Sequence, residues 1–133
     1  MKVEIFTLCD YAAKYGDSLC VVGTGEIFRS KKAGYVIRNK FLVYRIRFEA
    51  GDKGKLRLVF SISDDKGNEI THLAADEFQP DYQNVYGFNA ETGVVPLETV
   101  VLQKLGVFSA SLFANGGILA SIPIFVFQSS GMG

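Results

Sequence analysis

Three side chains of this sequence have the chemistry of a nucleophilic site, namely Cys9, Asp10 and His72. A cysteine thiolate needs a base within about 3 Å of the sulfur and a further group that orients this base. His72 is the only histidine, and its spacing from Cys9 does not indicate that the two meet. The sequence also lacks a glycine turn before a helix that would form an oxyanion hole, and a helix N-terminus that would activate the thiol. We therefore expect Cys9 to be a core thiol, Asp10 a cap or turn residue, His72 an exposed strand residue, and the protein not to be an enzyme.

Metal and cofactor sites are also disfavoured. The oxygen-rich segment DDKGNE, which includes Asp64, Asp65, Asn68 and Glu69, lacks the spacing of an EF-hand calcium loop and is more typical of a hairpin turn. Cys9 and Cys20 show neither C-x-x-C spacing nor a nearby histidine, as a zinc site would. The glycines form no G-x-G-x-x-G or Walker pattern. We expect no metal and no cofactor.

The most regular pattern lies between Phe41 and Ile62. Apolar and polar residues alternate before the segment AGDKG and again after it, which predicts an antiparallel hairpin with one core face and a turn near Asp52. The residues expected on the core face are Leu42, Tyr44, Ile46, Phe48, Leu56, Leu58, Phe60 and Ile62.

The outer face of this predicted hairpin carries Arg45, Arg47 and Arg57. With a turn near Asp52, Arg47 would face Arg57, and like charges directly opposite destabilise a sheet. We expect a carboxylate from elsewhere in the chain, or an external anion, to lie between them. An anion-binding or nucleic-acid-binding face is therefore an alternative function. Nucleic acid is disfavoured because 14 Lys and Arg residues balance 14 Asp and Glu residues.

A second candidate binding segment is aromatic. Tyr82 and Tyr86 lie with Phe78 and Phe88 among amide side chains, an arrangement that can stack on sugar rings. The chain has no Trp, the usual stacking residue, so a core or subunit-interface role explains these aromatics better.

The elements that must position these residues are short strands. We expect strands at residues 2–9, 19–22, 26–29, from about 36, 69–73, and 97–105, where helical spacing competes with strand propensity. Residues 10–14 could form a helical turn and residues 90–96 a loop. Asn115-Gly116 predicts a closing hairpin between 107–114 and 118–127, with Pro123 at a sheet edge or bulge. Seven to eight strands predict an all-β antiparallel sandwich, Ig-like or related, with a β-barrel as the alternative.

The chain of 133 residues fits one domain, expected over 1–128, with a flexible tail at 129–133. Its first fifteen residues show no signal-peptide core, and no apolar run is long enough for a membrane helix. We therefore expect a cytoplasmic protein without membrane contact.

Three segments together resemble a known family: VEIFTLCDYA with GDSLCVVG at 3–13 and 16–23, FLVYRIRFE at 41–49, and LGVFSASLFANGGILASIPIFV at 105–126. The sequence is similar to an uncharacterised family of short bacterial β-sandwich proteins, with a FxLCDxA-like first strand and a Ser-x-Pro last strand. The resemblance implies a β-sandwich in the bacterial cytoplasm and assigns no catalytic residue.

The function we expect is that of a non-catalytic interaction module or self-associating subunit, with a second copy or another protein as its partner. Weak support for catalysis and a last strand that is apolar on both faces motivate this expectation. The alternatives are the arginine face as an anion or nucleic-acid binder, and an enzyme with an atypical Cys9 nucleophile.

Overall fold

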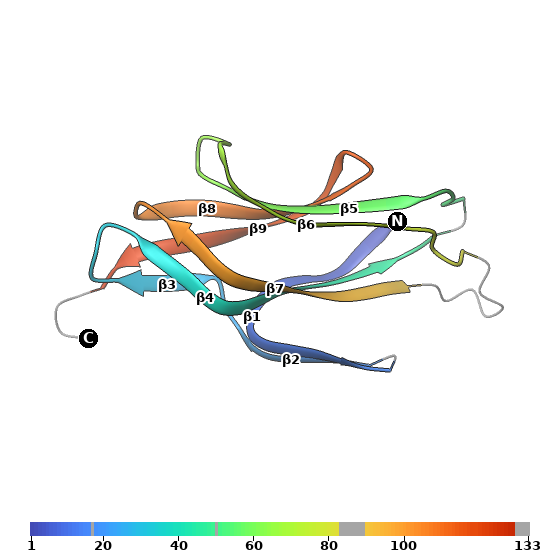
Figure 1. The fold of residues 1–133 in the computed structure, drawn as a ribbon, viewed down its shortest axis with the longest axis horizontal. Helices are drawn as coiled ribbons and strands as arrows, with labels where there is room; N and C mark the ends of the chain where they lie inside the picture. Colours follow the sequence, from blue (N-terminus) through green and yellow to red (C-terminus); the bar gives the residue numbers. More distant parts are fainter. Residues whose placement is uncertain (17, 50, 83–89, 130–133) are drawn as a thin grey trace.

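The computed structural model describes residues 1–16, 18–49, 51–82 and 90–129, and its regular elements are all strands (Figure 1). The strands are β1 (Lys2–Tyr15), β2 (Ser18–Thr24), β3 (Ile27–Ser30), β4 (Tyr35–Arg47), β5 (Leu56–Ser63), β6 (Glu69–Phe78), β7 (Ala90–Leu102), β8 (Gly106–Ala114) and β9 (Gly117–Gln128). No helix among the described residues is long and apolar enough to cross a membrane.

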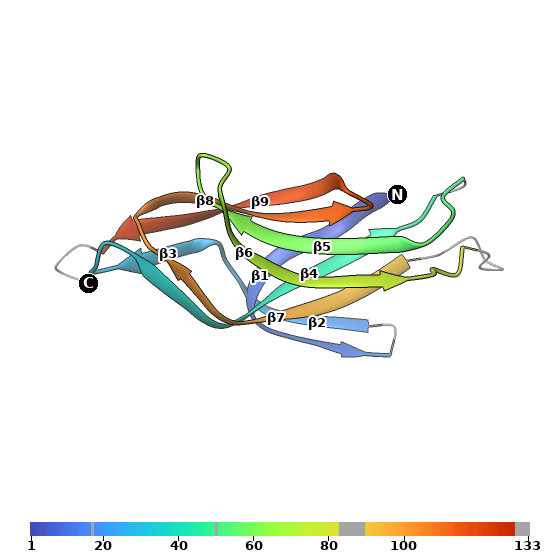
Figure 2. The same cartoon turned by 45° about the horizontal axis from the view of Figure 1, so that its top comes forward.

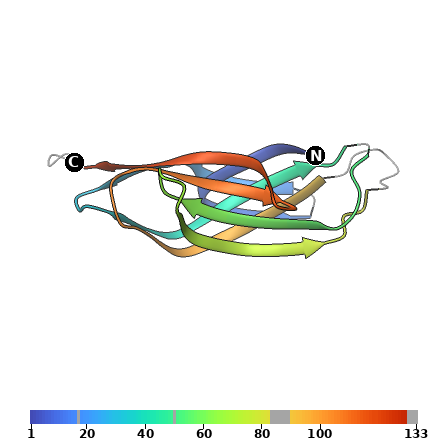
Figure 3. The same cartoon turned by 90° about the horizontal axis from the view of Figure 1, so that it is seen from above.

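The strands form two layers (Figures 1 and 2). One sheet has the order β2-β1-β4-β7 and the other has the order β3-β9-β8-β5-β6. All pairs are antiparallel except β3 with β9. Viewed from above, strands of the two sheets cross at an angle (Figure 3). The all-β sandwich is confirmed, with nine strands among the described residues instead of the seven to eight predicted. The barrel alternative is wrong because the described strands form two separate sheets.

The two alternating segments line the interior, but they do not form the predicted hairpin. β4 pairs with β1 and β7, whereas β5 pairs with β6 and β8 in the other sheet. The connection between them therefore crosses from one layer to the other. A period of two fixes which side of a strand is apolar and says nothing about its neighbour in the sheet. The expected core residues are buried, as predicted: Leu42, Tyr44, Ile46, Phe48, Leu56, Leu58, Phe60 and Ile62.

The first strand is longer than predicted, because residues 10–14 continue it and form no helical turn. Its first half pairs with β4 as far as Cys9, and its second half pairs with β2. The β1–β2 hairpin thus leaves the edge of β4 and lies over the outer side of β4 and β7 (Figure 1). A small apolar cluster fills this contact, made of Cys9, Ala12 and Val43 with Ile5, Leu19, Val21, Phe41 and Val94.

Strand β7 replaces the loop predicted at 90–96 and confirms the strand predicted at 97–105 as far as Leu102. It pairs with β4 from Ala90 to Leu102. Ile37 and Leu42 on β4 are both fully buried, although their positions differ by an odd number and a regular strand would point them to opposite faces. Asn39 between them has a φ of 54°, which rotates the strand so that the inward face changes.

The closing hairpin of β8 and β9 is confirmed. Asn115 and Gly116 have φ values of 50° and 85°, as a two-residue type I′ turn requires. The Phe125 N–H donates to the Glu26 carbonyl at 2.8 Å, so Phe125 turns its backbone nitrogen toward the β3 side of β9. Pro123, two residues earlier, turns its nitrogen to the same side, where the pairing with β3 has not yet begun. Pro123 therefore lies at an open edge, as expected. The outer face of β9 is only partly covered, because Phe127 remains 43% exposed.

Candidate functional site

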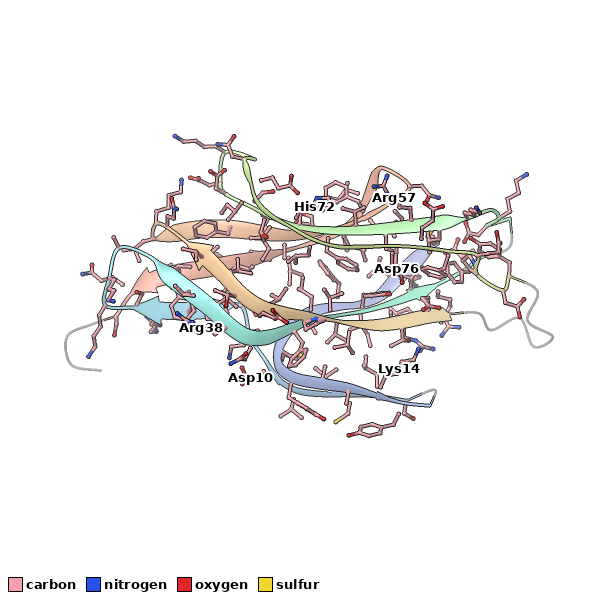
Figure 4. All side chains as sticks on the ribbon, viewed as in Figure 1. Asp10, Lys14, Arg38, Arg57, His72 and Asp76 are labelled. Carbon is pink, nitrogen blue, oxygen red and sulfur yellow. The ribbon has the colours of Figure 1, made fainter. Side chains whose placement is uncertain are left out.

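The three residues of the nucleophile hypothesis do not meet. Cys9 and Asp10 lie on β1, whereas His72 lies on β6 in the opposite layer (Figure 4). Asp10 pairs with Lys40, and His72 Nδ1 lies 2.9 Å from Glu69 Oε1. Cys9 is 1% exposed, and burial raises the pKa of its thiol. A buried, protonated thiol without a nearby base is the opposite of an activated nucleophile.

The acidic segment at 64–69 forms the expected turn. Asp64 Oδ1 accepts hydrogen bonds from the N–H groups of Lys66 and Asn68, both at 2.9 Å. These contacts, that of Asn68 first, lower the pKa of Asp64. Asp65 forms an ion pair with Lys104 at 2.9 Å. The described ranges contain no group of three or more His, Cys, Asp or Glu side chains that could hold a metal ion.

The three arginines do not form one face. Arg45 and Arg47 lie on β4, while Arg57 lies on β5 in the other layer, opposite Glu77 in the sheet register. The predicted contact of Arg47 with Arg57 is therefore wrong. The expected carboxylate is present beside Arg45 and Arg47. It belongs to Glu4, which accepts hydrogen bonds from Arg45 Nε at 3.0 Å and from Arg47 Nε at 2.9 Å. Arg47, followed by Arg45, lowers the pKa of Glu4.

The same network fixes the free end of the β1–β2 hairpin. Lys14 Nζ donates to the Thr92 carbonyl at 3.2 Å, and Arg45 Nη1 donates to Thr92 Oγ1 at 3.0 Å. Thr92 is buried on β7, so these bonds attach the end of β1 to the outer side of the sheet (Figure 4). We conclude that Lys14 and Arg45, through their bonds to Thr92, hold the hairpin in position.

Tyr82 has a structural role in the connection between the sheets. Its ring packs edge-on against Phe48 with centroids 5.1 Å apart, and its hydroxyl donates to the Gly54 carbonyl at 2.9 Å. Phe78 packs partly buried against the core. The other predicted binding residue, Tyr86, and Phe88 lie outside the described residues. Tyr82 is thereby tied to the connection between the sheets.

A groove of about 680 Å³ opens between the edges of β6 and β7. Its lining includes the buried Phe108 and Val100 and the exposed Ile70 and Val101. Its charged side chains are Asp64, which is held in the turn, and Lys104, which pairs with Asp65. The groove therefore contains no arrangement of acid, base and nucleophile that could catalyse a reaction.

The terminal strands of the two sheets differ in how they discourage further pairing. An exposed strand edge offers free N–H and C=O groups to another chain, and charged residues, Pro or short length normally oppose this. Strand β3 has only four residues and includes Arg29. Strand β2, with the sequence SLCVVGT, has no charged residue and no Pro. The other two terminal strands carry charged residues or Pro that discourage further pairing: Glu69, Asp76 and Glu77 on β6, and Glu91, Pro96 and Glu98 on β7.

The outer face of the β1–β2 hairpin is also apolar. Tyr11 pairs with Val22, and Tyr15 pairs with Ser18, so these side chains share one face of the hairpin, where the Tyr11 ring also packs edge-on against Phe41 with centroids 6.2 Å apart. Tyr11, Tyr15 and Val22 are 48%, 63% and 53% exposed. Cys20 is exposed on the same face, opposite Ala13. We call the free edge of β2 together with this face the β2 edge.

Sequence reasoning identified a strand at 19–22 but not its place at the end of a sheet. The signal was the lack of charge between Ser18 and Thr24 in a chain where 21% of the residues are charged. The lack of charge indicates an unprotected sheet edge only once the strand order places β2 at the end of its sheet.

The fold and these surfaces define an all-β sandwich protein whose described residues show no assembled catalytic or metal centre. The chain belongs to the family described as Family of unknown function (DUF6941), whose model matches residues 4–127. This match confirms the resemblance to an uncharacterised family.

No curated protein matches the sequence. Among solved structures, the chain is similar to Pseudomonas fluorescens alkylpurine DNA glycosylase AlkC bound to DNA containing an abasic site analog, with 12% sequence identity and a TM-score of 0.47. The similarity covers 95% of this chain and 30% of the glycosylase chain, so this chain spans less than a third of that protein.

Proposed function

We propose that this protein is a non-catalytic module that self-associates through the β2 edge. The observation that carries the proposal is the composition of β2, the one terminal strand among the described strands that has neither a charged residue nor Pro. Its free backbone groups are available for strand pairing, and the exposed Tyr11, Tyr15 and Val22 supply apolar surface beside them.

The energetics favour association at this place. Burying a side chain the size of valine contributes roughly 1.5–3 kcal/mol, and added strand pairing satisfies backbone groups that face water in the monomer. The network of Lys14, Arg45 and Thr92 holds the hairpin against the sheet, so little order has to be gained on binding. The net charge of zero leaves no overall repulsion between two copies.

Light scattering with Val22→Lys tests the proposal. The charged side chain would lie at the contact between the copies, so we expect the dissociation constant to rise at least about tenfold. Val107→Lys is the matched control, because Val107 is 43% exposed on β8, an inner strand of the other sheet. This control should keep the mass of the wild-type assembly. A monomeric wild-type protein at about 100 µM, a concentration at which weak interfaces associate, would refute the proposal.

Anion binding at the hairpin is a second candidate function, supported by a local excess of positive charge. Arg45 and Arg47 share the carboxylate of Glu4, and Lys14 and Arg45 both bind Thr92. A polyanion would contact Lys14 in particular, since its ammonium group can rotate away from the Thr92 carbonyl. Heparin affinity at low salt should fall for Lys14→Gln and stay unchanged for Lys66→Gln. No measurable heparin binding by the wild-type protein would exclude this function.

A further inference from the structure

We infer that the β2 edge binds a second copy of this chain, strand against strand, around a two-fold axis that passes beside Cys20. The inference rests on the proposed function and adds to it the identity of the partner strand and its register. It follows from the length of the regular part of β2 and from the order of side chains along it.

The regular part of β2 ends before Gly23. This glycine has a φ of 72°, which interrupts the extended backbone, and a Cβ at its position would overlap the Asp10 side chain. The extended segment therefore runs from Ser18 to Val22, and its central residue is Cys20. When two identical segments pair antiparallel about a two-fold axis with full overlap, the central residue lies opposite its own copy. Ser18 then lies opposite Val22, and Leu19 lies opposite Val21.

This register places side chains of complementary size together. On the outer face, the large Val22 meets the small Ser18 of the other copy, so one row runs from Tyr11 through Val22 to Ser18 and Tyr15 of the second copy. Two such rows flank the central pair of Cys20 residues. Shifting the register by one residue would place the outward-facing side chains of one strand opposite the inward-facing side chains of the other.

The inner face supports the same arrangement. Leu19 and Val21 pack in the small apolar cluster with Cys9, Ala12 and Val43. In the two-fold pair, Leu19 of one copy lies beside Val21 of the other, so the two clusters become one continuous apolar layer. The four-stranded sheets join with β2 against β2 at the centre. A partner strand of different sequence would have to reproduce both rows, whereas a second copy supplies them by symmetry.

Oxidative cross-linking tests the register. Diamide accepts two electrons and two protons from two thiols, so that a disulfide forms and the diamide becomes its hydrazine. Residues directly opposite in a sheet have Cβ atoms about 4.5–5.5 Å apart, close enough for a disulfide after a small adjustment. We therefore expect the wild-type protein to give covalent dimers through Cys20, and Cys20→Ser to give none.

Two variants in the Cys20→Ser background sharpen the test. One adds Ser18→Cys and the other adds Val22→Cys. A mixture of the two should form a covalent heterodimer, because position 18 of one copy lies opposite position 22 of the other. Each variant alone should not cross-link, because its two thiols would lie four residues apart along the strands, about 13 Å.

The outcomes separate the register from the proposed function. If light scattering shows a dimer but Ser18→Cys or Val22→Cys cross-links alone and the mixture does not, the register is wrong and self-association stands. If the wild-type protein is a dimer and none of the thiols cross-link, the second copy binds elsewhere, and the inference fails. A wild-type protein that stays monomeric refutes both.

Discussion

Tyr44 on β4 and Phe60 on β5 lie across the interior from each other, with ring centroids 5.3 Å apart and planes inclined by 41°. Each ring comes from a different sheet, so this contact joins the two layers near the centre of the core. Both residues are buried, at 5% and 2% exposure. The connection around Asp52, which is held by the N-terminal amine at 2.8 Å, brings the two strands to opposite sides of this contact.

Ile46 should be among the most sensitive core positions, because it is fully buried between the sheets. Ile46→Ala is expected to lower the free energy of unfolding by about 2–5 kcal/mol, since it removes buried methyl groups and leaves a cavity. Ile46→Lys should prevent folding, because the ammonium group would have no partner there. Urea unfolding followed by fluorescence measures the first change. Ile118→Ala, at a position that is 61% exposed, should change stability by no more than about 0.5 kcal/mol.

Gly93 should tolerate no side chain while Tyr44 is present. A Cβ at Gly93 would overlap the Tyr44 ring and hydroxyl. Gly93→Ala is expected to cost about 1–3 kcal/mol through overpacking. A double-mutant cycle with Tyr44→Leu checks the cause, because the shorter side chain leaves room for the added methyl group. Equal costs of Gly93→Ala with and without Tyr44→Leu would contradict the assigned contact.

The burial pattern of the strands could be predicted from periodicity alone. Strands β4 and β5 show the limit of that reasoning. The apolar faces of both strands were predicted correctly because alternation reports burial directly. Their pairing was not, because a glycine-rich connection can return a strand beside its predecessor or carry it to a facing sheet. Asn39 and the change of face at β4 also left no periodic signal, since a single φ above zero depends on tertiary context.

Stability should decrease in acid partly through Glu4. Arg47 and Arg45 lower the pKa of Glu4 below its ordinary value of 4.5. A carboxyl group with a lowered pKa in the folded state contributes stability above its unfolded pKa and loses it as the pH falls through the folded value. The urea midpoint should therefore fall between about pH 5 and pH 2, and it should fall less for Glu4→Gln. Glu98→Gln, on an exposed part of β7, should keep the wild-type pH dependence.

The two cysteines should differ in reactivity. Cys9 is buried and burial raises the pKa of its thiol, whereas Cys20 is exposed on the hairpin. Iodoacetamide at neutral pH should label Cys20 of the folded Val22→Lys variant, in which the β2 edge stays free, and leave Cys9 unmodified. Unfolding in urea should make both thiols reactive. Rapid labelling of Cys9 in the folded protein would revive the nucleophile hypothesis.

Neither the identity of the carboxylate partner of Arg45 and Arg47 nor the exposed edge of β2 could be predicted from the sequence. Arg45 and Arg47 were identified from alternation, but their partner Glu4 lies on another strand, at the irregular register of β1 between Val3 and Ile5. The importance of β2 depends on its being last in its sheet, which follows from the position of β1 beside β4. Strand order is a long-range property, and local sequence patterns do not encode it in a form that can be recognised in one chain.

Hydrogen exchange of the β2 amides at two protein concentrations reports directly on whether β2 pairs with a second copy. Between about 1 µM and 100 µM, the outward-facing amides of residues 18–22 should become more slowly exchanging as β2 pairs with a second copy. The free edge of β7, with Glu91, Pro96 and Glu98, should exchange at the same rate at both concentrations. A dimer that forms without any added protection in β2, or with new protection along β7 instead, would contradict the account.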